Sequence, residues 1–348
     1  MKQLFTALLA GLLLVGCGTS TTTEAPVAVD SQSTEELTEK IEETVKEASE
    51  NVSIEELVAN SGFKADGLTI LSPSGAPALS LIPAVLAGAN VNFVDGADPL
   101  QAALVNPSPE YDVIIAPSNL GLKLAEAGKT SYRMKGVATW GNLYIVAAKG
   151  TSNDASTWTN VASFGEQSVT GKVFADVYGD ALNMDEVTWY NSTAETSAAL
   201  LAGEADVAML AEPNATATIA KAKENGKELE IIDDVQMRFA GTSGIGFPQA
   251  AIFVSEAAYA EKKDQIDSMF NLMSDFSMQV HALDADAIAA LIEACGGAEK
   301  FGVPSAQVVG KVWDRLNINV VDAREHMDEL QKFAPLFDIQ DVEAALLK

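Results

Sequence analysis

The stretch Asp112–Ala127, DVIIAPSNLGLKLAEA, decides the fold. It opens with an apolar run, Val113–Ala116, of the length expected for a buried strand. Pro117–Asn119 then predicts a turn, and a helix is expected over Leu120–Ala127. Because continuous apolar strands that alternate with helices are typical of parallel sheets, this unit favours an α/β fold with a sheet covered on both faces.

Similar units recur on both sides of this stretch. Two consecutive strands are predicted within Gly136–Ala148, where Trp140–Asn142 interrupts the pattern. From Glu256 onward the pattern is almost wholly helical. Further strands are predicted at Leu68–Leu71, Val91–Val94, Val161–Phe164, Val187–Tyr190, Val207–Leu210, Ile231–Ile232 and Ala250–Val254. Two similar α/β units in tandem, with a returning strand, predict two lobes around a cleft.

The fold class expected is therefore α/β, with two lobes, two crossing hinge strands and a helical C-terminal part. The crossings are expected near Tyr144–Val146 and Phe253–Val254. The predicted domains are a signal peptide (1–16), a lipidated cysteine with a tether and an acidic spacer helix (17–63), lobe 1 (64–146 plus 254–348) and lobe 2 (147–253).

The N-terminus has the pattern of a secretory signal. Met1 and Lys2 precede an apolar run, Leu4–Val15, which is too short for a permanent membrane span. Leu14–Cys17, LVGC, resembles a bacterial lipobox, which implies cleavage before Cys17 and attachment of a lipid to its sulfur. The alternative is an ordinary signal peptide followed by a coincidental cysteine.

Two segments separate Cys17 from the predicted globular part. Gly18–Gln32 is rich in Thr and Ser and is expected to be a flexible tether. Thr34–Glu50 holds seven Glu and two Lys, with apolar residues at helical spacing, and predicts an amphipathic helix. A solvated spacer helix is preferred over a helix that binds a partner.

Composition restricts the function. The formal net charge of −27 argues against a nucleic-acid partner and against electrostatic binding to anionic lipid, so we expect the lipid on Cys17 to provide the membrane anchor. With Cys17 acylated, Cys295 has no partner for a disulfide within the chain and is expected to be a buried structural thiol.

The turns between strands and helices carry short hydroxyl and amide side chains without Lys or Arg. Ligands of open α/β sheets bind beyond the carboxyl ends of the strands, where helix N-termini favour anions. The sequence therefore predicts an anion site with neutral donors, although each of these residues could instead be an ordinary helix cap. The turn residues in question are Ser74, Gly75, Ser118, Asn119, Gln167, Ser168, Thr170, Asn191, Ser192, Thr193 and Asn214.

Aromatic residues near the same edges could pack against a ligand. They are Trp140, Tyr190 and Phe247, and core packing is the alternative for each. Glu212, at the end of a predicted strand, could pair with a cationic group of a ligand or complement a helix dipole.

Little in the sequence supports catalysis. His281 and His326 lie in separate helical segments, outside any cluster with metal-ligand spacing. No Gly-Xaa-Ser-Xaa-Gly elbow and no Walker-type loop occurs in the sequence. We therefore expect no catalytic residue, no metal and no cofactor.

Four segments resemble the substrate-binding lipoproteins of ABC importers, in the group that binds nitrate, sulfonates, taurine and thiamine-pyrimidine precursors (NMT1/THI5-like). They are LSPSGAPA (71–78), DVIIAP (112–117), GEADVAMLAEP (203–213) and FPQA (247–250). The resemblance covers about Lys64 to Lys348 and implies a periplasmic-binding-protein fold of type 2. It places binding positions at Ser74, Gly75, Ala76, Ser118, Asn119, Asn142 and the turns at Ser168 and Ser192.

The resemblance implies an extracytoplasmic solute receptor that closes on its ligand and delivers it to an ABC permease. The ligand expected is a small organic anion or zwitterion with a sulfonate or carboxylate, or a heteroaromatic vitamin precursor. We expect a monomer, held by lipid at the outer face of the cell membrane, without a nucleic-acid partner. An enzyme on the same fold and a lipid-tethered sensing or adhesion subunit are the alternatives.

Overall fold

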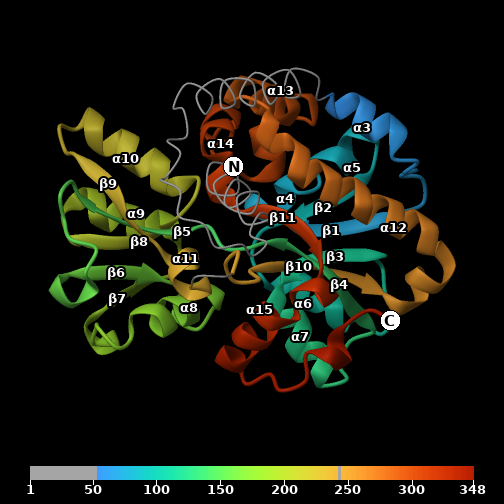
Figure 1. Ribbon diagram of the computed structural model, residues 1–348, viewed down its shortest axis with the longest axis horizontal. Coiled ribbons are helices and arrows are strands. Elements are labelled where there is room, and N and C mark those ends of the chain that lie inside the picture. The colour runs from blue at the N-terminus through green and yellow to red at the C-terminus, as the bar shows by residue number, and fades with distance from the viewer. Residues whose placement is uncertain (1–52, 242–243) are drawn as a thin grey trace, which may run out of the picture. The chain divides into compact units, whose positions relative to one another are not determined.

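The computed structural model describes residues 53–241 and 244–348. The predicted signal peptide, the lipidation site Cys17 and the acidic helix Thr34–Glu50 lie outside these residues. Within Val52–Lys348 the described residues form one compact unit that contains two sheets. Figure 1 shows both sheets with helices packed around them. The α/β prediction is confirmed.

The first sheet has six strands in the order β11-β4-β10-β3-β1-β2. The three strands β1, β2 and β3 are parallel, whereas β10 runs antiparallel to both β3 and β4, and β11 runs antiparallel to β4. The strands are β1 (Thr69–Pro73), β2 (Asn90–Val94), β3 (Val113–Pro117), β4 (Tyr132–Thr139), β10 (Ala250–Ser255) and β11 (Ile318–Asp322). The sheet is therefore mixed rather than parallel, because β10, the strand that returns from the second sheet, runs in the direction opposite to β3.

The second sheet has five strands in the order β7-β6-β8-β5-β9. Here β6 is parallel to β7 and to β8, and β5 is antiparallel to β8 and to β9. The strands are β5 (Leu143–Ala148), β6 (Val161–Phe164), β7 (Thr188–Tyr190), β8 (Val207–Ala211) and β9 (Leu229–Asp234). We refer to the first sheet with its helices as lobe 1 and to the second sheet with its helices as lobe 2.

The helices follow the strand pattern that the sequence predicts. In lobe 1 they are α3 (Ile54–Asn60), α4 (Ala76–Leu79), α5 (Ile82–Leu86), α6 (Asp98–Val105) and α7 (Ser118–Glu126). In lobe 2 they are α8 (Val169–Tyr178), α9 (Thr193–Ala202), α10 (Asn214–Glu224) and α11 (Val235–Ala240). The C-terminal part adds α12 (Glu256–Gln279), α13 (Ala285–Ala294), α14 (Ala306–Val312) and α15 (Met327–Phe333).

The chain changes sheets earlier than the sequence predicts. Strand β5 pairs only with strands of the second sheet, and β10 pairs only with strands of the first. The crossings therefore lie at Trp140–Asn142 and at Phe247–Gln249, and the crossings predicted at Tyr144–Val146 and Phe253–Val254 are wrong by several residues. An apolar strand looks the same in either sheet, and only its hydrogen-bonding partners decide to which sheet it belongs.

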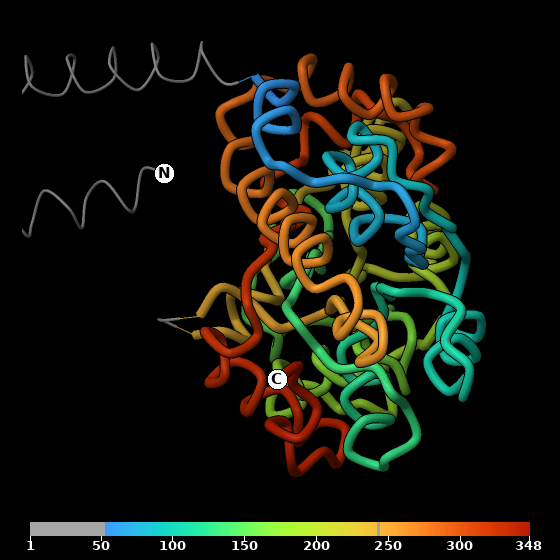
Figure 2. Tube along the Cα trace, turned by 90° about the vertical axis from the view of Figure 1, so that its right-hand side faces the viewer, coloured from blue at the N-terminus to red at the C-terminus, as the bar shows by residue number. Residues whose placement is uncertain are grey.

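The folded part also begins before Lys64, the predicted start. Ile54 in α3 is 2% exposed and belongs to an apolar cluster with Ile82 and Phe276. Helix α3 packs along α12, and Figure 2 shows the two side by side. Residues 54–63, which the sequence assigns to the tether and spacer, thus belong to the folded unit, and Ile54 and Phe63 are buried in its core.

Strand β11 was missed, because the sequence favours helix for the whole C-terminal part. Its five residues, INVVD, lie between helical segments and carry little pattern of their own. The strand extends the first sheet beside β4, and Val320 is buried in the core of that sheet. The prediction that Cys295 is buried is confirmed, and burial raises the pKa of its thiol to about 11.

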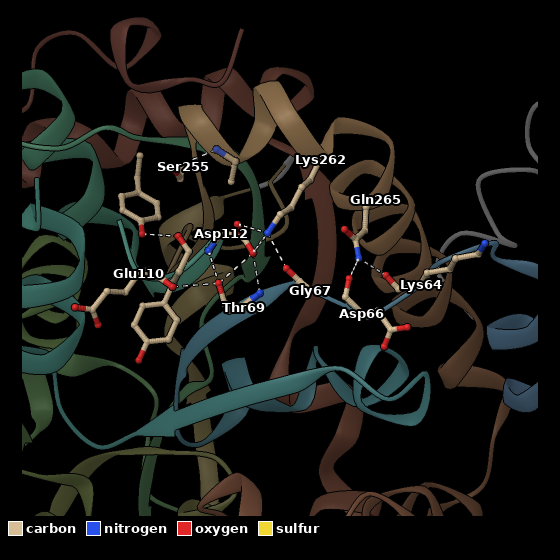
Figure 3. Close-up of polar contacts among 12 residues, drawn as sticks. Lys64, Asp66, Gly67, Thr69, Glu110, Asp112, Ser255, Lys262 and Gln265 are labelled. Atoms are coloured by element: carbon tan, nitrogen blue, oxygen red, sulfur yellow. Dashed lines mark hydrogen bonds and ion pairs between the residues drawn. The ribbon is translucent and has the colours of Figure 1, made fainter. Parts of the chain in front are cut away.

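A polar cluster fixes the amino ends of β1 and β3 to α12 (Figure 3). Lys262 Nζ donates to both carboxylate oxygens of Asp112, at 2.9 Å each, and to the carbonyl of Gly67 at 2.6 Å. Thr69 donates its backbone N–H and its hydroxyl to the same carboxylate, at 2.8 and 3.0 Å. The cluster lies at the opposite end of these strands from the cavity described next, so its role is structural.

Candidate functional site

A cavity of about 580 Å³ lies between the two lobes. Its wall contains the carboxyl-terminal residues of four strands, Pro73 of β1, Pro117 of β3, Phe164 of β6 and Ala211 of β8. The other lining residues are Ser74, Gly75, Ala76, Pro77, Ala97, Asn119, Leu120, Asn142, Ser168, Val169, Thr170, Thr193, Glu212, Pro213, Asn214, Gln249, Ala250, Gly302, Val303 and Pro304. The cavity is thus at the end of the sheets where α/β folds bind ligands.

Helix N-termini from both lobes reach this cavity. Asn119 belongs to the first turn of α7, Val169 and Thr170 begin α8, Thr193 begins α9 and Asn214 begins α10. The first backbone N–H groups of a helix have no partner within that helix, and the helix dipole is positive at this end. The combined arrangement favours a ligand with a negatively charged group.

The turn after β1 brings the backbone to the cavity wall. Gly75 has φ +93°, a conformation that glycine adopts without steric cost. Its N–H donates to the carbonyl of Phe301 at 2.7 Å, and the N–H of Ser74 donates to the carbonyl of Val94 at 2.9 Å. These bonds leave the side chain of Ser74 in the lining of the cavity.

The turn after β6 is braced by its own hydroxyl groups. Ser168 Oγ donates to the carbonyl of Gly165 at 2.7 Å, and Thr170 Oγ1 donates to the carbonyl of Phe164 at 3.1 Å. The two hydroxyl oxygens also lie 2.8 Å apart, within hydrogen-bonding distance. Both side chains therefore shape the turn at the same time as they line the cavity.

Asn142 joins the first crossing to the end of β8. Its Nδ2 donates to the carbonyl of Glu212 at 2.7 Å, and the N–H of Glu212 donates to the carbonyl of Asn142 at 2.9 Å. Gln249, on the second crossing, donates its Nε2 to Asn142 Oδ1 at 3.3 Å. One side chain in the cavity wall therefore links both crossings.

Glu212 is the one charged side chain among the described residues that line the cavity. Its side chain is 0% exposed, and its Oε1 accepts from Arg315 Nε at 2.7 Å. Thr216 donates its hydroxyl to Oε1 at 2.8 Å and its N–H to Oε2 at 3.0 Å. The charge of Glu212 is thus compensated within the protein.

The cavity lining contains ten of the residues that the sequence singles out for binding. They are Ser74, Gly75, Ala76, Asn119, Asn142, Ser168, Thr170, Thr193, Glu212 and Asn214. They come from turns after β1, β3, β4, β6, β7 and β8, and the structure brings these turns of both lobes to one cavity. Their contact with a ligand stays a prediction.

Three predicted residues lie in the core instead. Phe247 is 0% exposed, and its ring stacks on Phe333 with a centroid distance of 6.5 Å. Trp140 is buried on the other side of the first crossing, where its Nε1 donates to the carbonyl of Asn319 at 2.9 Å. Ser118 is also buried, and its hydroxyl has no hydrogen-bond partner in the described part of the chain. Core packing, the alternative considered for both aromatic residues, is what the structure shows.

The remaining predicted residues lie beside the cavity rather than in its lining. Ser192 is the N-cap of α9, where its hydroxyl accepts from the N–H of Glu195 at 3.2 Å, and the N–H of Asn191 donates to Glu195 Oε2 at 2.9 Å. Gln167 is exposed, and half-buried Tyr190 packs on the apolar core of lobe 2. The cap alternative thus describes Ser192 correctly.

Some lining residues were not predicted. Gln249 lies in the FPQA motif on the second crossing, and this motif could have indicated it as a binding position. Gly302, Val303 and Pro304 come from the C-terminal part, where no local pattern indicates a binding loop. Gly75 N–H bonds to the neighbouring Phe301 carbonyl, so tertiary packing alone brings this loop to the cavity.

The described residues contain no group of three or more His, Cys, Asp or Glu side chains that could hold a metal ion. Nor does any helix in residues 53–241 and 244–348 have the length and apolar character that a membrane span requires.

Comparison with solved structures identifies the fold. An ABC transporter protein from Parabacteroides distasonis superposes with a TM-score of 0.61 at 19% identity, over 80% of this chain and 94% of that one. The periplasmic aliphatic sulphonate-binding protein SsuA of Escherichia coli gives a TM-score of 0.54 at 16% identity, over 81% of this chain and 92% of that one. The chain has the fold of these proteins.

A third structure was solved with a ligand. The alkanesulfonate-binding protein SsuA of Xanthomonas axonopodis, bound to MOPS, gives a TM-score of 0.50 at 15% identity, over 80% of this chain and 96% of that one. No protein-family model matches the sequence. A search of curated proteins also finds no match. The predicted two-lobed, periplasmic-binding-protein-like fold is confirmed by these structures.

Proposed function

We propose that this protein is the solute-binding component of an ABC importer and that it binds a small organic anion between its lobes. The observation that carries the proposal is the cavity of about 580 Å³ to which α7, α8, α9 and α10 present their N-terminal residues. A cavity of this size suits a small molecule. Helix N-termini from both sides provide donors and positive potential for an acidic group.

The lining limits the chemistry of the ligand. The described lining residues include no Lys, Arg or His, and the charge of Glu212 is compensated by Arg315. An anion would therefore be held by backbone N–H groups and by neutral side chains such as those of Ser74, Asn119 and Thr193. Prolines and small apolar residues make up much of the remaining wall and suit an aliphatic or heteroaromatic body.

The fold supports the same class of function. The sulphonate-binding proteins named above share the fold of this chain over about 80% of its length. Fold alone does not determine a ligand, so the argument for an anion rests on the cavity. A sulfonate or carboxylate is the acidic group we propose, and a vitamin-precursor pyrimidine is the second ligand class. The mechanism proposed is closure of the two lobes about the crossings at Trp140–Asn142 and Phe247–Gln249.

We further propose that the protein is monomeric, is anchored by lipid at Cys17 and delivers its ligand to a membrane permease. Replacement of Cys17 by Ser tests the anchor, since the variant should move from the membrane fraction to the soluble extract. An unchanged distribution would favour the alternative of an ordinary signal peptide.

Thermal unfolding in the presence of candidate ligands tests the main proposal. The panel contains MOPS, taurine, a straight-chain alkanesulfonate, an amino acid and a thiamine-pyrimidine precursor. A ligand that binds only the folded form raises the Tm, and a concentration a hundred times the Kd adds about 2.7 kcal/mol of stability. The proposal fails if no member of the panel shifts the Tm at millimolar concentration.

A matched pair of variants locates the binding. Asn119→Asp adds a negative charge to the first turn of α7 at the cavity, where it should suit the helix dipole but repel an anion. Gln101→Glu adds the same charge to an exposed position of α6. We expect Asn119→Asp to weaken anion binding at least about tenfold. Gln101→Glu should bind like the original protein.

A further inference from the structure

Arg315 and Glu212 come from different lobes. Arg315 lies in the turn Trp313–Leu316, whose first and last side chains are buried in the core of lobe 1 together with Ile318 of β11. Glu212 follows β8 of lobe 2 and lines the cavity. We infer that the Arg315–Glu212 pair is a neutralising latch: it ties the two lobes together at the cavity wall and cancels the charge of Glu212, so that an anion is accepted there.

The contacts of the pair form a closed ring with Thr216 of α10. Arg315 Nε donates to Glu212 Oε1 at 2.7 Å, and Arg315 Nη2 donates to Thr216 Oγ1 at 2.7 Å. The hydroxyl of Thr216 in turn donates to Glu212 Oε1 at 2.8 Å. Two N–H groups of one guanidinium therefore bind two side chains of lobe 2 from fixed positions in one plane, whereas an ammonium group would have to reach both from a single nitrogen on a flexible side chain.

A second contact joins the same turn to lobe 2. The hydroxyl of Tyr144, in β5, donates to the carbonyl of Arg315 at 3.0 Å. Burial, followed by the negative charges of Asp234 and Glu212, raises the pKa of Tyr144 above its ordinary value, so the hydroxyl remains a donor. Lobe 2 thus holds both the side chain and the backbone of Arg315.

The electrostatic role follows from burial. The side chain of Glu212 is 0% exposed, whereas that of Arg315 is 41% exposed. A buried carboxylate without a counter-charge is strongly unfavourable, and it would repel an anion bound in the same cavity. Arg315 therefore acts on the ligand through Glu212, as a positioning residue that sets charge selectivity.

The charge selectivity of the cavity is tested by MOPS binding to the full chain that carries Cys17→Ser. This part of the inference rests on the proposed function. Arg315→Gln leaves Glu212 uncompensated and should weaken MOPS binding at least about tenfold at low ionic strength. The double variant Glu212→Gln/Arg315→Gln removes both charges and should bind MOPS at least about threefold more tightly than Arg315→Gln does. The inference is overturned if the double variant binds as weakly as Arg315→Gln, or if Arg315→Gln binds normally.

Arg133→Gln is the matched control for this measurement. It also removes an arginine from an ion pair, with Glu256 at 3.4 Å, but the pair lies between β4 and α12 within lobe 1. We expect this variant to bind MOPS as the original does. Equal weakening in Arg133→Gln and Arg315→Gln would show an effect of net charge alone and would overturn the latch.

A ligand-free measurement separates this inference from the proposed function. Spin labels at Gln101→Cys in α6 and Ala198→Cys in α9 report the distance between the lobes, because both positions are exposed. Native Cys295 is buried and its pKa is raised to about 11, so it should react slowly with the label.

The label distances are compared without ligand in the original chain and in three variants. Arg315→Gln should lengthen or broaden the distance distribution relative to the original, whereas Arg133→Gln should not. Arg315→Lys keeps the charge but replaces the planar guanidinium by one nitrogen on a more flexible side chain, so it should hold the lobes less firmly and also broaden the distribution while it retains MOPS binding. It serves as the second variant if Arg315→Gln does not fold. Unchanged distributions in the Arg315 variants overturn the latch. Absence of MOPS binding by the original chain counts against the proposed sulfonate ligand alone.

Discussion

Asn142 and Glu212 exchange two hydrogen bonds where the first crossing meets the end of β8. Asn142 Nδ2 donates to the carbonyl of Glu212 at 2.7 Å, and Glu212 N–H donates to the carbonyl of Asn142 at 2.9 Å. Asn142 belongs to a crossing between the sheets, and Glu212 lines the cavity. A movement of this crossing would therefore displace Glu212 at the proposed ligand site.

Asn142→Ala should lower the free energy of unfolding by about 1–3 kcal/mol, because the buried carbonyl of Glu212 loses its donor. Urea unfolding followed by circular dichroism measures the change. Asn92→Ala is the control: Asn92 is exposed and bonds to Tyr111 at the surface, so a loss below about 0.5 kcal/mol is expected. Equal losses in both variants would contradict a special role for Asn142.

Gly141→Ala should be more destabilising than an ordinary glycine substitution. Gly141 has φ +91°, and a Cβ there would lie 2.5 Å from Cε1 of Phe247 on the other crossing. Backbone strain and overpacking together predict a loss of about 2–4 kcal/mol. Gly150→Ala has the same strain, at φ +85°, but its Cβ would meet nothing within 4 Å. Urea unfolding should give this control a loss of only about 1 kcal/mol.

Lys262→Met should destabilise the protein by about 2 kcal/mol, because the carboxylate of Asp112 would lose its counter-charge in a largely buried position. The neighbouring Lys263 pairs with Asp267 but is 59% exposed, so Lys263→Met should cost clearly less. Thermal unfolding of both variants measures the difference. A larger effect at Lys263 would show that the cluster in Figure 3 is not what fixes α12 to the sheet.

Two aspartates should give opposite contributions to the pH dependence of stability. Burial by itself would raise the pKa of Asp267, but hydrogen bonds from Lys135 and Lys263 outweigh it and lower the pKa. Its contribution is therefore present above the pKa of the unfolded chain, about 3.9, and is lost as the pH falls through the folded value. Asp267→Asn should cost most stability near pH 7, and the deficit should shrink below about pH 4.

Asp234 is the counterpart, since burial and then the neighbouring Asp233 raise its pKa despite a hydrogen bond from the N–H of Met237. The folded protein gains stability as the pH falls through this raised value. Asp234→Asn keeps an oxygen for the cap and should be at least as stable as the original at pH 7, with the difference vanishing in acid. Urea titrations at several pH values measure both variants, and a deficit for Asp234→Asn that grows with pH would contradict the argument.

Most elements of the fold could be predicted from short patterns. The predicted strands Val113–Ala116 and Val207–Leu210 lie within β3 and β8. Ser192 caps α9, which was one of the two roles considered for it. These features depend on a few neighbouring residues, so the sequence shows them directly. Strand β11 was missed because its five residues are stabilised by pairing with β4, far away along the chain.

The candidate site could be predicted only in part. Ser74, Asn119 and Ser168 were predicted because turns after strands must face one edge of a sheet. Trp140 and Phe247 lie in the two crossings, close in sequence to cavity-lining residues, but their side chains are buried in the core. A crossing of three residues has no repeating pattern from which the direction of a side chain could be predicted. The loop Gly302–Pro304 reaches the cavity through packing of the C-terminal part against β1.

The sequence by itself determined the alternation of strands and helices, the polar turns and the excess of negative charge, because each depends on local composition and spacing. Tertiary structure decided which sheet each strand joins, where the chain crosses between lobes and which distant residue neutralises Glu212. Arg315 stands 103 positions from Glu212, and no local pattern connects them. Their contact exists because the packing of the two lobes brings the turn Trp313–Leu316 and the end of β8 together at the cavity.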